Sequence, residues 1–133
     1  MKLFALFAIT VGISVSACSG DAIDDGRVEC SQSNRTGTYL AHAVRHPGGT
    51  CADITDELVR LDPDEPLDPL CQFGRPDQWS HDQCTLTREI FCPDFSILTV
   101  SKEVAANGAR LEGVVTLTAR DCVSTYDVTW VRQ

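Results

Sequence analysis

The chain has 133 residues, of which 43% are hydrophobic, and its formal net charge is −8. This acidic balance argues against nucleic-acid binding, which needs a basic surface, and against electrostatic attraction to an anionic membrane. The length suits one globular domain with its own core.

The N-terminal residues predict an export signal. Lys2 carries one positive charge, and residues 3–17 carry none. As a helix, this uncharged stretch would span roughly 22 Å, less than the ~30 Å hydrocarbon core of a bilayer. We therefore expect residues 1–17 to be a cleaved signal peptide and not a membrane span.

The predicted cleavage site reads Val15-Ser16-Ala17-Cys18. These residues resemble the lipobox of bacterial lipoproteins, and the resemblance is confined to residues 1–18. It implies that the Cys18 thiol receives a diacylglycerol, that the chain is cut just before this residue and that the new amine is acylated. It also implies the outer membrane of a bacterium with two membranes, because Ser19 and not Asp follows the cysteine. The alternative is a secreted protein without lipid.

The number of cysteines agrees with lipidation. The chain has seven, and an odd number leaves one thiol unpaired in an oxidising compartment. If Cys18 carries lipid, the others can form three disulfides. Those others are Cys30, Cys51, Cys71, Cys84, Cys92 and Cys122.

After the signal peptide, residues 18–29 predict the lipidated cysteine and a short polar tether, and residues 30–133 predict a single domain. We expect that domain to be mainly β, bordering on α+β, with an antiparallel meander of four to five strands, one short helix and three disulfides. Residues 37–45 predict a strand at an edge of the sheet or on top of it. The helix is expected over residues 53–61, where apolar residues recur on one helical face.

The C-terminal half of the chain predicts the meander, because apolar and polar residues alternate there with a period of two. Its four strands are expected at 84–92, 96–105, 110–119 and 122–132. Asn107-Gly108 favours a two-residue hairpin turn, since both central residues of such a turn need positive φ. That turn would place Val104 opposite Leu111.

A second tight turn extends this register to the last strand. A turn at Arg120-Asp121 would place Trp130 beside Leu111 and Tyr126 beside Val115. A slip of one residue would turn both aromatic rings to solvent, so the register can be tested directly.

The first strand of the meander is expected to point Leu86 and Ile90 inward. A turn at residues 93–95 would then place Ile90 beside Leu98. Such a sheet buries one face only, so another part of the chain must cover it. The helix, the first strand and the disulfide-tied loops are the candidates.

The predicted sheet also limits the disulfides. Cys84 and Cys92 flank one strand and would lie roughly 26 Å apart, whereas a disulfide tolerates at most about 7 Å between Cα atoms. Cys122 is expected about 14 Å from Cys92, across three strand spacings. If the sheet does not curl shut, each of these three must pair with one of the three cysteines that precede them in the domain. Loop length favours Cys71–Cys84 as the first such pair.

Two sets of side chains are candidate metal ligands. His42 and His46 would suit zinc on a helix, but on the predicted strand they lie about 13 Å apart, too far for one ion. The second set is a group of acids that lacks the glycine of a calcium loop and is stiffened by prolines. It comprises Asp62, Asp64, Glu65 and Asp68. We predict no metal site and no cofactor.

Catalytic motifs are missing from the sequence. There is no Gly-x-Ser-x-Gly, no His-Glu-x-x-His, no phosphate-binding glycine loop and no Cys-x-x-Cys. His81 beside Asp82 is the nearest approach to an acid–base pair. An uncharacterised hydrolase or metal-dependent enzyme is therefore the least favoured functional class.

The favoured interpretation is a non-enzymatic, membrane-anchored module with a structural or binding role in the cell envelope. The first alternative is an inhibitor or binder of a protein partner that makes contact through the acidic, proline-containing loop over residues 62–83. Phe73 and Trp79 lie in that loop. Exposed, they would contact the partner; buried, they would cap the open face of the sheet.

Overall fold

The structure is a computed structural model, and it describes residues 30–133. The predicted signal peptide, the predicted lipid attachment at Cys18 and the predicted tether lie outside the described residues. Among residues 30–133, no helix has the length and apolar character needed to cross a bilayer.

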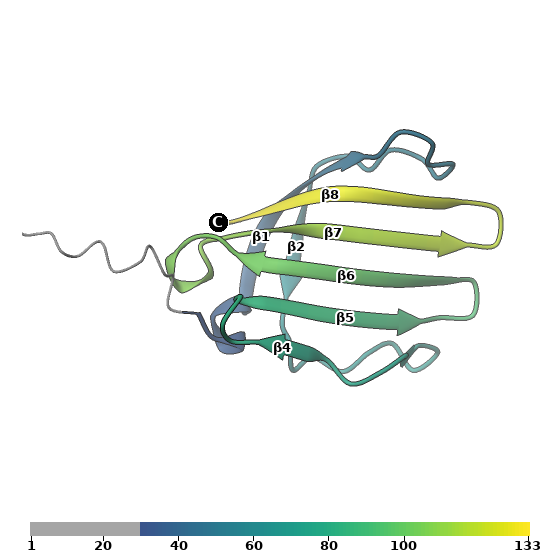
Figure 1. Cartoon of the computed structure of the whole chain (residues 1–133). Helices are drawn as coiled ribbons and strands as arrows, with labels where there is room; N and C mark the ends of the chain where they lie inside the picture. The colour runs from purple at the N-terminus through teal and green to yellow at the C-terminus, as the bar shows by residue number, and fades with distance from the viewer. Residues whose placement is uncertain (1–29) are drawn as a thin grey trace, which may run out of the picture.

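One antiparallel sheet of eight strands makes up the domain. In chain order the strands are β1 (Gly37–Arg45), β2 (Glu57–Leu61), β3 (Gln72–Phe73), β4 (Gln78–Ser80), β5 (Thr85–Phe91), β6 (Phe95–Glu103), β7 (Arg110–Ala119) and β8 (Val123–Arg132). The order across the sheet is β2-β1-β8-β7-β6-β5-β3, and β4 also pairs with β5. The sheet curls into a half-barrel, so that β1 and β2 cross behind the meander β5–β8 (Figure 1). The only helical elements in the described part are two 3₁₀ turns, η3 (Gln32–Arg35) and η4 (Ala106–Gly108).

The predicted meander and its last register are confirmed. The four strands β5–β8 fall within two residues of the predicted bounds. In the β7–β8 ladder, Leu111 pairs with Trp130 and Val115 pairs with Tyr126, as the turn at Arg120-Asp121 predicted. Both aromatic side chains are buried.

The predicted register of β6 is wrong by one residue. Glu103, and not Val104, lies opposite Leu111, because the chain between β6 and β7 does not make a two-residue turn. Asn107 does have positive φ, but it lies inside η4, and the ladder closes where the backbone N–H of Val104 donates to Arg110. The turn on the other side of β6 is shorter than predicted, since Cys92 N–H bonds to the Phe95 carbonyl.

Ile90 consequently pairs with Ile97 and not with Leu98. β6 is shifted by one residue in the same direction against both of its neighbours. Its side chains therefore point to the opposite face from the one predicted, whereas those of β5 and β7 do not. Leu86 is buried and Ile90 half-buried on the concave face, so β5 faces the way that was predicted.

The predicted helix over residues 53–61 is also wrong. Residues 57–61 form β2, which pairs with β1 through contacts such as Tyr39 opposite Val59. Leu58, which the helix would have buried, is 65% exposed on the outer face. β1 itself is a strand over residues 37–45 as predicted, but it lies between β2 and β8 and is not at an edge.

The three disulfides are Cys30–Cys84, Cys51–Cys122 and Cys71–Cys92. Each therefore joins one of the last three cysteines to one of the first three in the domain, as the geometry of the sheet predicted. The preferred first pair, Cys71–Cys84, is wrong. Cys71 lies beside β3, whose two residues pair with the far end of β5, and this places it at Cys92.

The hydrophobic core fills only one side of the half-barrel. Its buried members come from β1, β7 and β8 and from the loop after β1. They are Tyr39, Cys51, Leu111, Tyr126, Val128 and Trp130. Within residues 30–133, β5 and β6 contribute no member to this cluster, although Leu86 is buried on their concave face.

Candidate functional site

A cavity of about 260 Å³ opens on the concave face of the half-barrel. Most of its lining comes from β5 and β6, from the segment just after β2 and from the edge of the core. The lining residues are Arg35, Leu61, Asp62, Pro63, Leu86, Arg88, Ile90, Ile97, Thr99, Ser101, Leu111 and Trp130. Apolar side chains therefore predominate, with charged groups at a few points.

The cavity results from how the sheet curls. The end of β2 carries Leu61 over the concave face, and the chain continues through Pro63. Arg88 on β5 donates a hydrogen bond to the Pro63 carbonyl oxygen at 3.1 Å. The segment after β2 thus reaches β5 through this side-chain hydrogen bond and not through strand pairing. Ile90 and Ile97 below it are only half-buried.

Arg35 supplies a polar wall of the cavity. It is 3% exposed, and its guanidinium donates to the Ser101 hydroxyl at 2.5 Å and to the carbonyl oxygens of Cys84 and Ser101 at 2.8 and 3.1 Å. The Trp79 ring lies against it, with the centroid 5.1 Å from Cζ. Burial lowers the pKa of Arg35, and the carboxylate of Glu103 opposes that shift.

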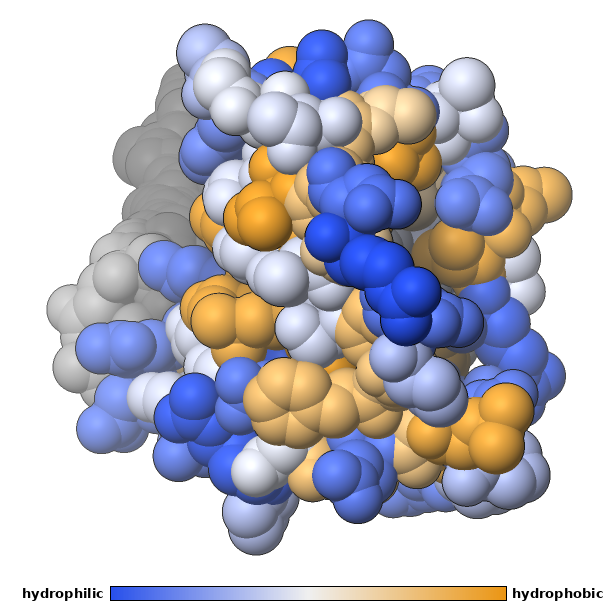
Figure 2. Space-filling model, turned by 90° about the vertical axis from the view of Figure 1, so that its right-hand side faces the viewer, coloured by the Kyte–Doolittle hydropathy of each residue, from blue (hydrophilic) through white to orange (hydrophobic). Residues whose placement is uncertain are grey.

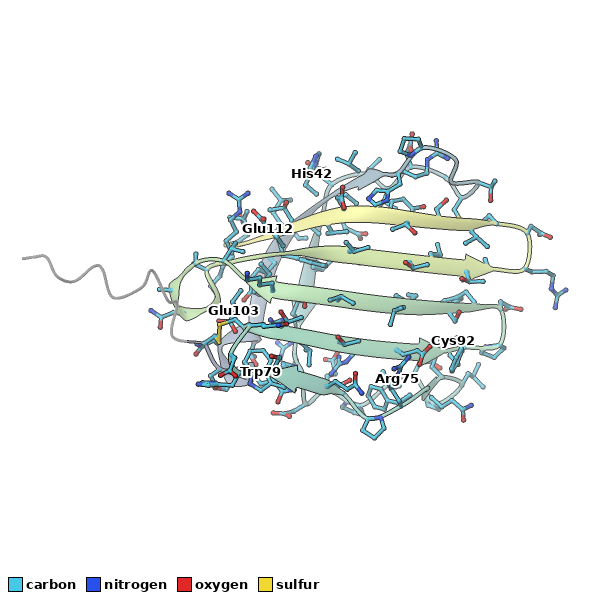
Figure 3. All side chains as sticks on the ribbon, in the orientation of Figure 1. His42, Arg75, Trp79, Cys92, Glu103 and Glu112 are labelled. Carbon is cyan, nitrogen blue, oxygen red and sulfur yellow. A yellow bond between two sulfur atoms is a disulfide. The ribbon has the colours of Figure 1, made fainter. Side chains whose placement is uncertain are left out.

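Glu103 neutralises this arginine. It is 1% exposed at the end of β6, with Oε2 lying 3.5 Å from Nε of Arg35. That separation is an ion pair and too long for a hydrogen bond. Within residues 30–133, neither Glu103 oxygen nor Arg35 Nε has a hydrogen-bond partner. A buried carboxylate costs several kcal/mol unless a cation compensates it, so the two residues depend on each other. Figure 3 shows Glu103 and Trp79 at the same end of the sheet.

Arg88 forms a second neutral pair at the cavity. Its Nε lies 3.1 Å from both carboxylate oxygens of Asp77, and its Nη2 lies 2.5 Å from Oδ2. Arg88 also lies under the Phe73 ring, 5.5 Å from the centroid. Asp62 carries the remaining charge of the lining, and its nearest cation is Arg60 at 3.5 Å.

The predicted contact residues Phe73 and Trp79 have different environments. Phe73, on β3, is 44% exposed. Trp79, on β4, is half-buried and pairs with Leu86. Each ring packs against an arginine of the cavity. Neither of the two predicted alternatives, an exposed contact residue or a buried cap on the sheet, therefore describes them completely.

The other predicted candidates lie elsewhere. His42 contacts Asp56 at 2.6 Å, and His46 contacts Asp127 at 2.8 Å, both outside the cavity. His81 and Asp82 are exposed in the turn before β5. Among residues 30–133, no cluster of His, Cys, Asp and Glu side chains is arranged to hold a metal ion.

Sequence reasoning missed the two pairs that shape the cavity. Glu103 follows Lys102 in a strand of alternating character, and its charge indicated the outer face. Arg35 is 68 residues away in sequence, so nothing local identifies it as the partner. Arg88 stands between Leu86 and Ile90, and its inward direction followed from their period of two.

Comparison with known proteins gives no further indication of function. No family model, no curated protein and no solved structure matches the chain. The geometry of the site therefore carries the functional argument by itself.

Proposed function

We propose that this chain is an exported, lipid-anchored binding module of the cell envelope, without enzymatic activity, and that the concave cavity is its binding site. The cavity carries the proposal. Ligand sites are concave, mostly apolar and equipped with a few polar groups, and the lining residues have this composition. Both arginines of the cavity are held in position by ion pairs. Polar groups at fixed positions in the lining can orient a bound ligand.

Three disulfides support the exported location. Structural disulfides form and persist in oxidising compartments, and these tie the chain at both ends of β5 and beside β8. The lipid anchor at Cys18 rests on the lipobox resemblance. Intact mass of the protein from its native host would test both features together. We expect cleavage before Cys18, added acyl chains and the loss of six thiol hydrogens.

The binding role can be tested by identifying a ligand that is bound to the purified protein. We expect a small molecule to co-purify with the protein from the host envelope and to be detected by native mass spectrometry. Thr99→Phe, which fills the cavity, should lose it. Val100→Phe is the matched control, because Val100 is the neighbouring residue of β6 but is exposed on the outer face. Equal occupancy of the two variants would contradict the proposal, as would a wild-type protein that binds nothing.

A second candidate function is recognition of a protein partner through residues 62–83. One observation favours it: exposed apolar side chains lie within three residues of Cys71 or Cys92 in sequence, and the disulfide ties their two segments together. They are Leu70, Phe73, Phe91 and Phe95, with exposed fractions of 75%, 44%, 43% and 39%. Cys92 and Arg75 mark this end of the sheet in Figure 3, and apolar patches appear there between polar residues in Figure 2.

Point substitutions test this candidate better than deletion of the loop, which would remove Cys71 and leave Cys92 unpaired. We expect Leu70→Ser with Phe73→Ser to lose partners in a pull-down from envelope extract. Leu58→Ser is the control, since Leu58 is 65% exposed on β2. Unchanged partners in the double variant would contradict this role.

A further inference from the structure

The charges around the cavity are balanced within the chain, and this restricts what the cavity can hold. Arg35 is paired with Glu103, and Arg88 is paired with Asp77. An anionic ligand would have to compete with a carboxylate that is already in place at either arginine. A cationic ligand would have to approach two guanidinium groups. Burying an unpaired charge is strongly unfavourable, so both kinds of ligand are disfavoured.

Asp62 adds to this discrimination. Its carboxylate lines the cavity and its side chain is 22% exposed. The carboxylate accepts a hydrogen bond from the backbone of Asp64 at 3.0 Å. Its partner Arg60, at 3.5 Å, is 67% exposed, and such an exposed pair is weak and screened by water. The carboxylate therefore still disfavours an anion at this part of the lining.

The apolar part of the lining determines the size and character of the ligand. Leu86, Ile90 and Ile97 lie on the adjacent strands β5 and β6. Leu61, the last residue of β2, and Pro63, just after it, also line the cavity. An apolar cavity of about 150 Å³ holds benzene. In proportion, the 260 Å³ here would hold about ten non-hydrogen atoms.

One buried polar group of the lining can recognise a ligand atom. Ser101 is 7% exposed, and its hydroxyl oxygen accepts from Arg35. A hydroxyl also has one hydrogen to donate. The Ser101 hydroxyl can therefore donate to a ligand oxygen at the same end of the cavity as the Arg35–Glu103 pair.

From these observations we infer that the cavity takes an uncharged molecule with an apolar body of about ten non-hydrogen atoms and one hydroxyl or carbonyl oxygen, which binds at Ser101. This inference rests on the proposed binding function and names its ligand class. Charge, more than shape, separates ligands from non-ligands at this site.

Three probes of one chain length test the inference in the full mature protein. They are 1-octanol, octanoate and octylammonium, which share an apolar body and differ in charge. Calorimetric titration at pH 7.5 should show 1-octanol binding at least about tenfold more tightly than either ion. A tenfold difference corresponds to about 1.4 kcal/mol, which is less than the cost of burying an unpaired charge. Trp130 lines the cavity, so its fluorescence in a Trp79→Phe background should report the same order.

Two variants that change only a charge should change the relative affinities of the three probes. Glu103→Gln leaves Arg35 as an uncompensated cation, and octanoate should then bind at least as well as 1-octanol. Asp62→Asn removes the repelling carboxylate without touching the buried pair, and octanoate affinity should rise several-fold. Glu112→Gln is the control, because Glu112 is exposed on the outer face beside Arg110, and it should leave all three affinities unchanged.

The outcomes separate the two proposals. Binding of none of the three probes would overturn the cavity as a binding site and this inference with it. Binding of octanoate or octylammonium as tightly as 1-octanol would leave the binding function standing and would overturn the ligand class. If Glu103→Gln fails to fold, the wild-type order and the Asp62→Asn variant still decide the question.

Discussion

Arg88 and Asp77 face each other in a fork, with Nε of the guanidinium 3.1 Å from both carboxylate oxygens and Nη2 2.5 Å from Oδ2. Because Arg88 also holds the Pro63 carbonyl, one side chain on β5 fixes two distant points of the loop between β2 and β4. Arg88 therefore connects the wall of the cavity to the loop that carries Asp77.

Asp77→Asn should loosen that arrangement. The variant keeps the shape of the side chain but removes the charge, and both partners are about one-fifth exposed. We expect a loss of about 1–2 kcal/mol in the free energy of unfolding, between the values typical of surface and buried pairs. Urea denaturation measures it. Asp64→Asn, an exposed acid of the same loop, should change stability by less than about 0.5 kcal/mol.

The β7–β8 register could be predicted because two aromatic residues and a two-residue turn agree on it. A slip would have exposed Tyr126 and Trp130, whose burial is the main gain of that ladder. The position of β6 could not be predicted in this way. Its true inner face carries Glu103, Ser101 and Thr99, which read as an outer face until Arg35 is known to lie behind them.

Residues 53–61 were misjudged for a related reason. Ile54, Leu58 and Leu61 share a helical face, but pairing with β1 decides the conformation, and tertiary contacts override such local patterns. Leu58 is left exposed as a consequence. The cavity itself depends on where that strand ends above β5, which no local pattern shows.

The three disulfides should differ in their contribution to stability. In the chain-entropy description, a cross-link stabilises more when it closes a longer loop. The separations are 71 residues for Cys51–Cys122, 54 for Cys30–Cys84 and 21 for Cys71–Cys92. Replacing both cysteines by Ala should therefore cost about 1 kcal/mol more at Cys51–Cys122 than at Cys71–Cys92. The burial of Cys51 in the core adds to the difference. Thermal unfolding of the two double variants compares them, and the reverse order would contradict the prediction.

Gly113 should tolerate no side chain. A Cβ there would overlap the carbonyl oxygen of Val100 and lie 2.7 Å from Cα of Ser101. These are backbone atoms of the neighbouring strand, which cannot rotate away. Gly113→Ala should destabilise the domain by about 2–3 kcal/mol, at the upper end of overpacking costs.

Gly48→Ala provides the contrast for that measurement. Its φ is +88°, and a Cβ there would meet nothing within 4 Å. The variant should show only the backbone cost of about 1–2 kcal/mol. Denaturant unfolding of both proteins separates the effect of contact from that of conformation. Equal stability of Gly113→Ala and the wild type would mean that β6 and β7 do not approach as closely as described.

Removing one partner of the Arg35–Glu103 pair should destabilise the domain more than replacing both partners with apolar residues. Arg35→Met leaves the Glu103 carboxylate buried without a cation, and it removes the donor to Ser101 and to the Cys84 carbonyl. We expect a loss of about 3–5 kcal/mol, the cost of removing one partner of a buried ion pair. The double variant Arg35→Met with Glu103→Leu buries no charge, so it should be more stable than Arg35→Met alone. A double-mutant cycle in urea measures the coupling. Additive losses would show that Glu103 is stabilised by something other than Arg35, and the charge balance of the cavity would then need a different partner.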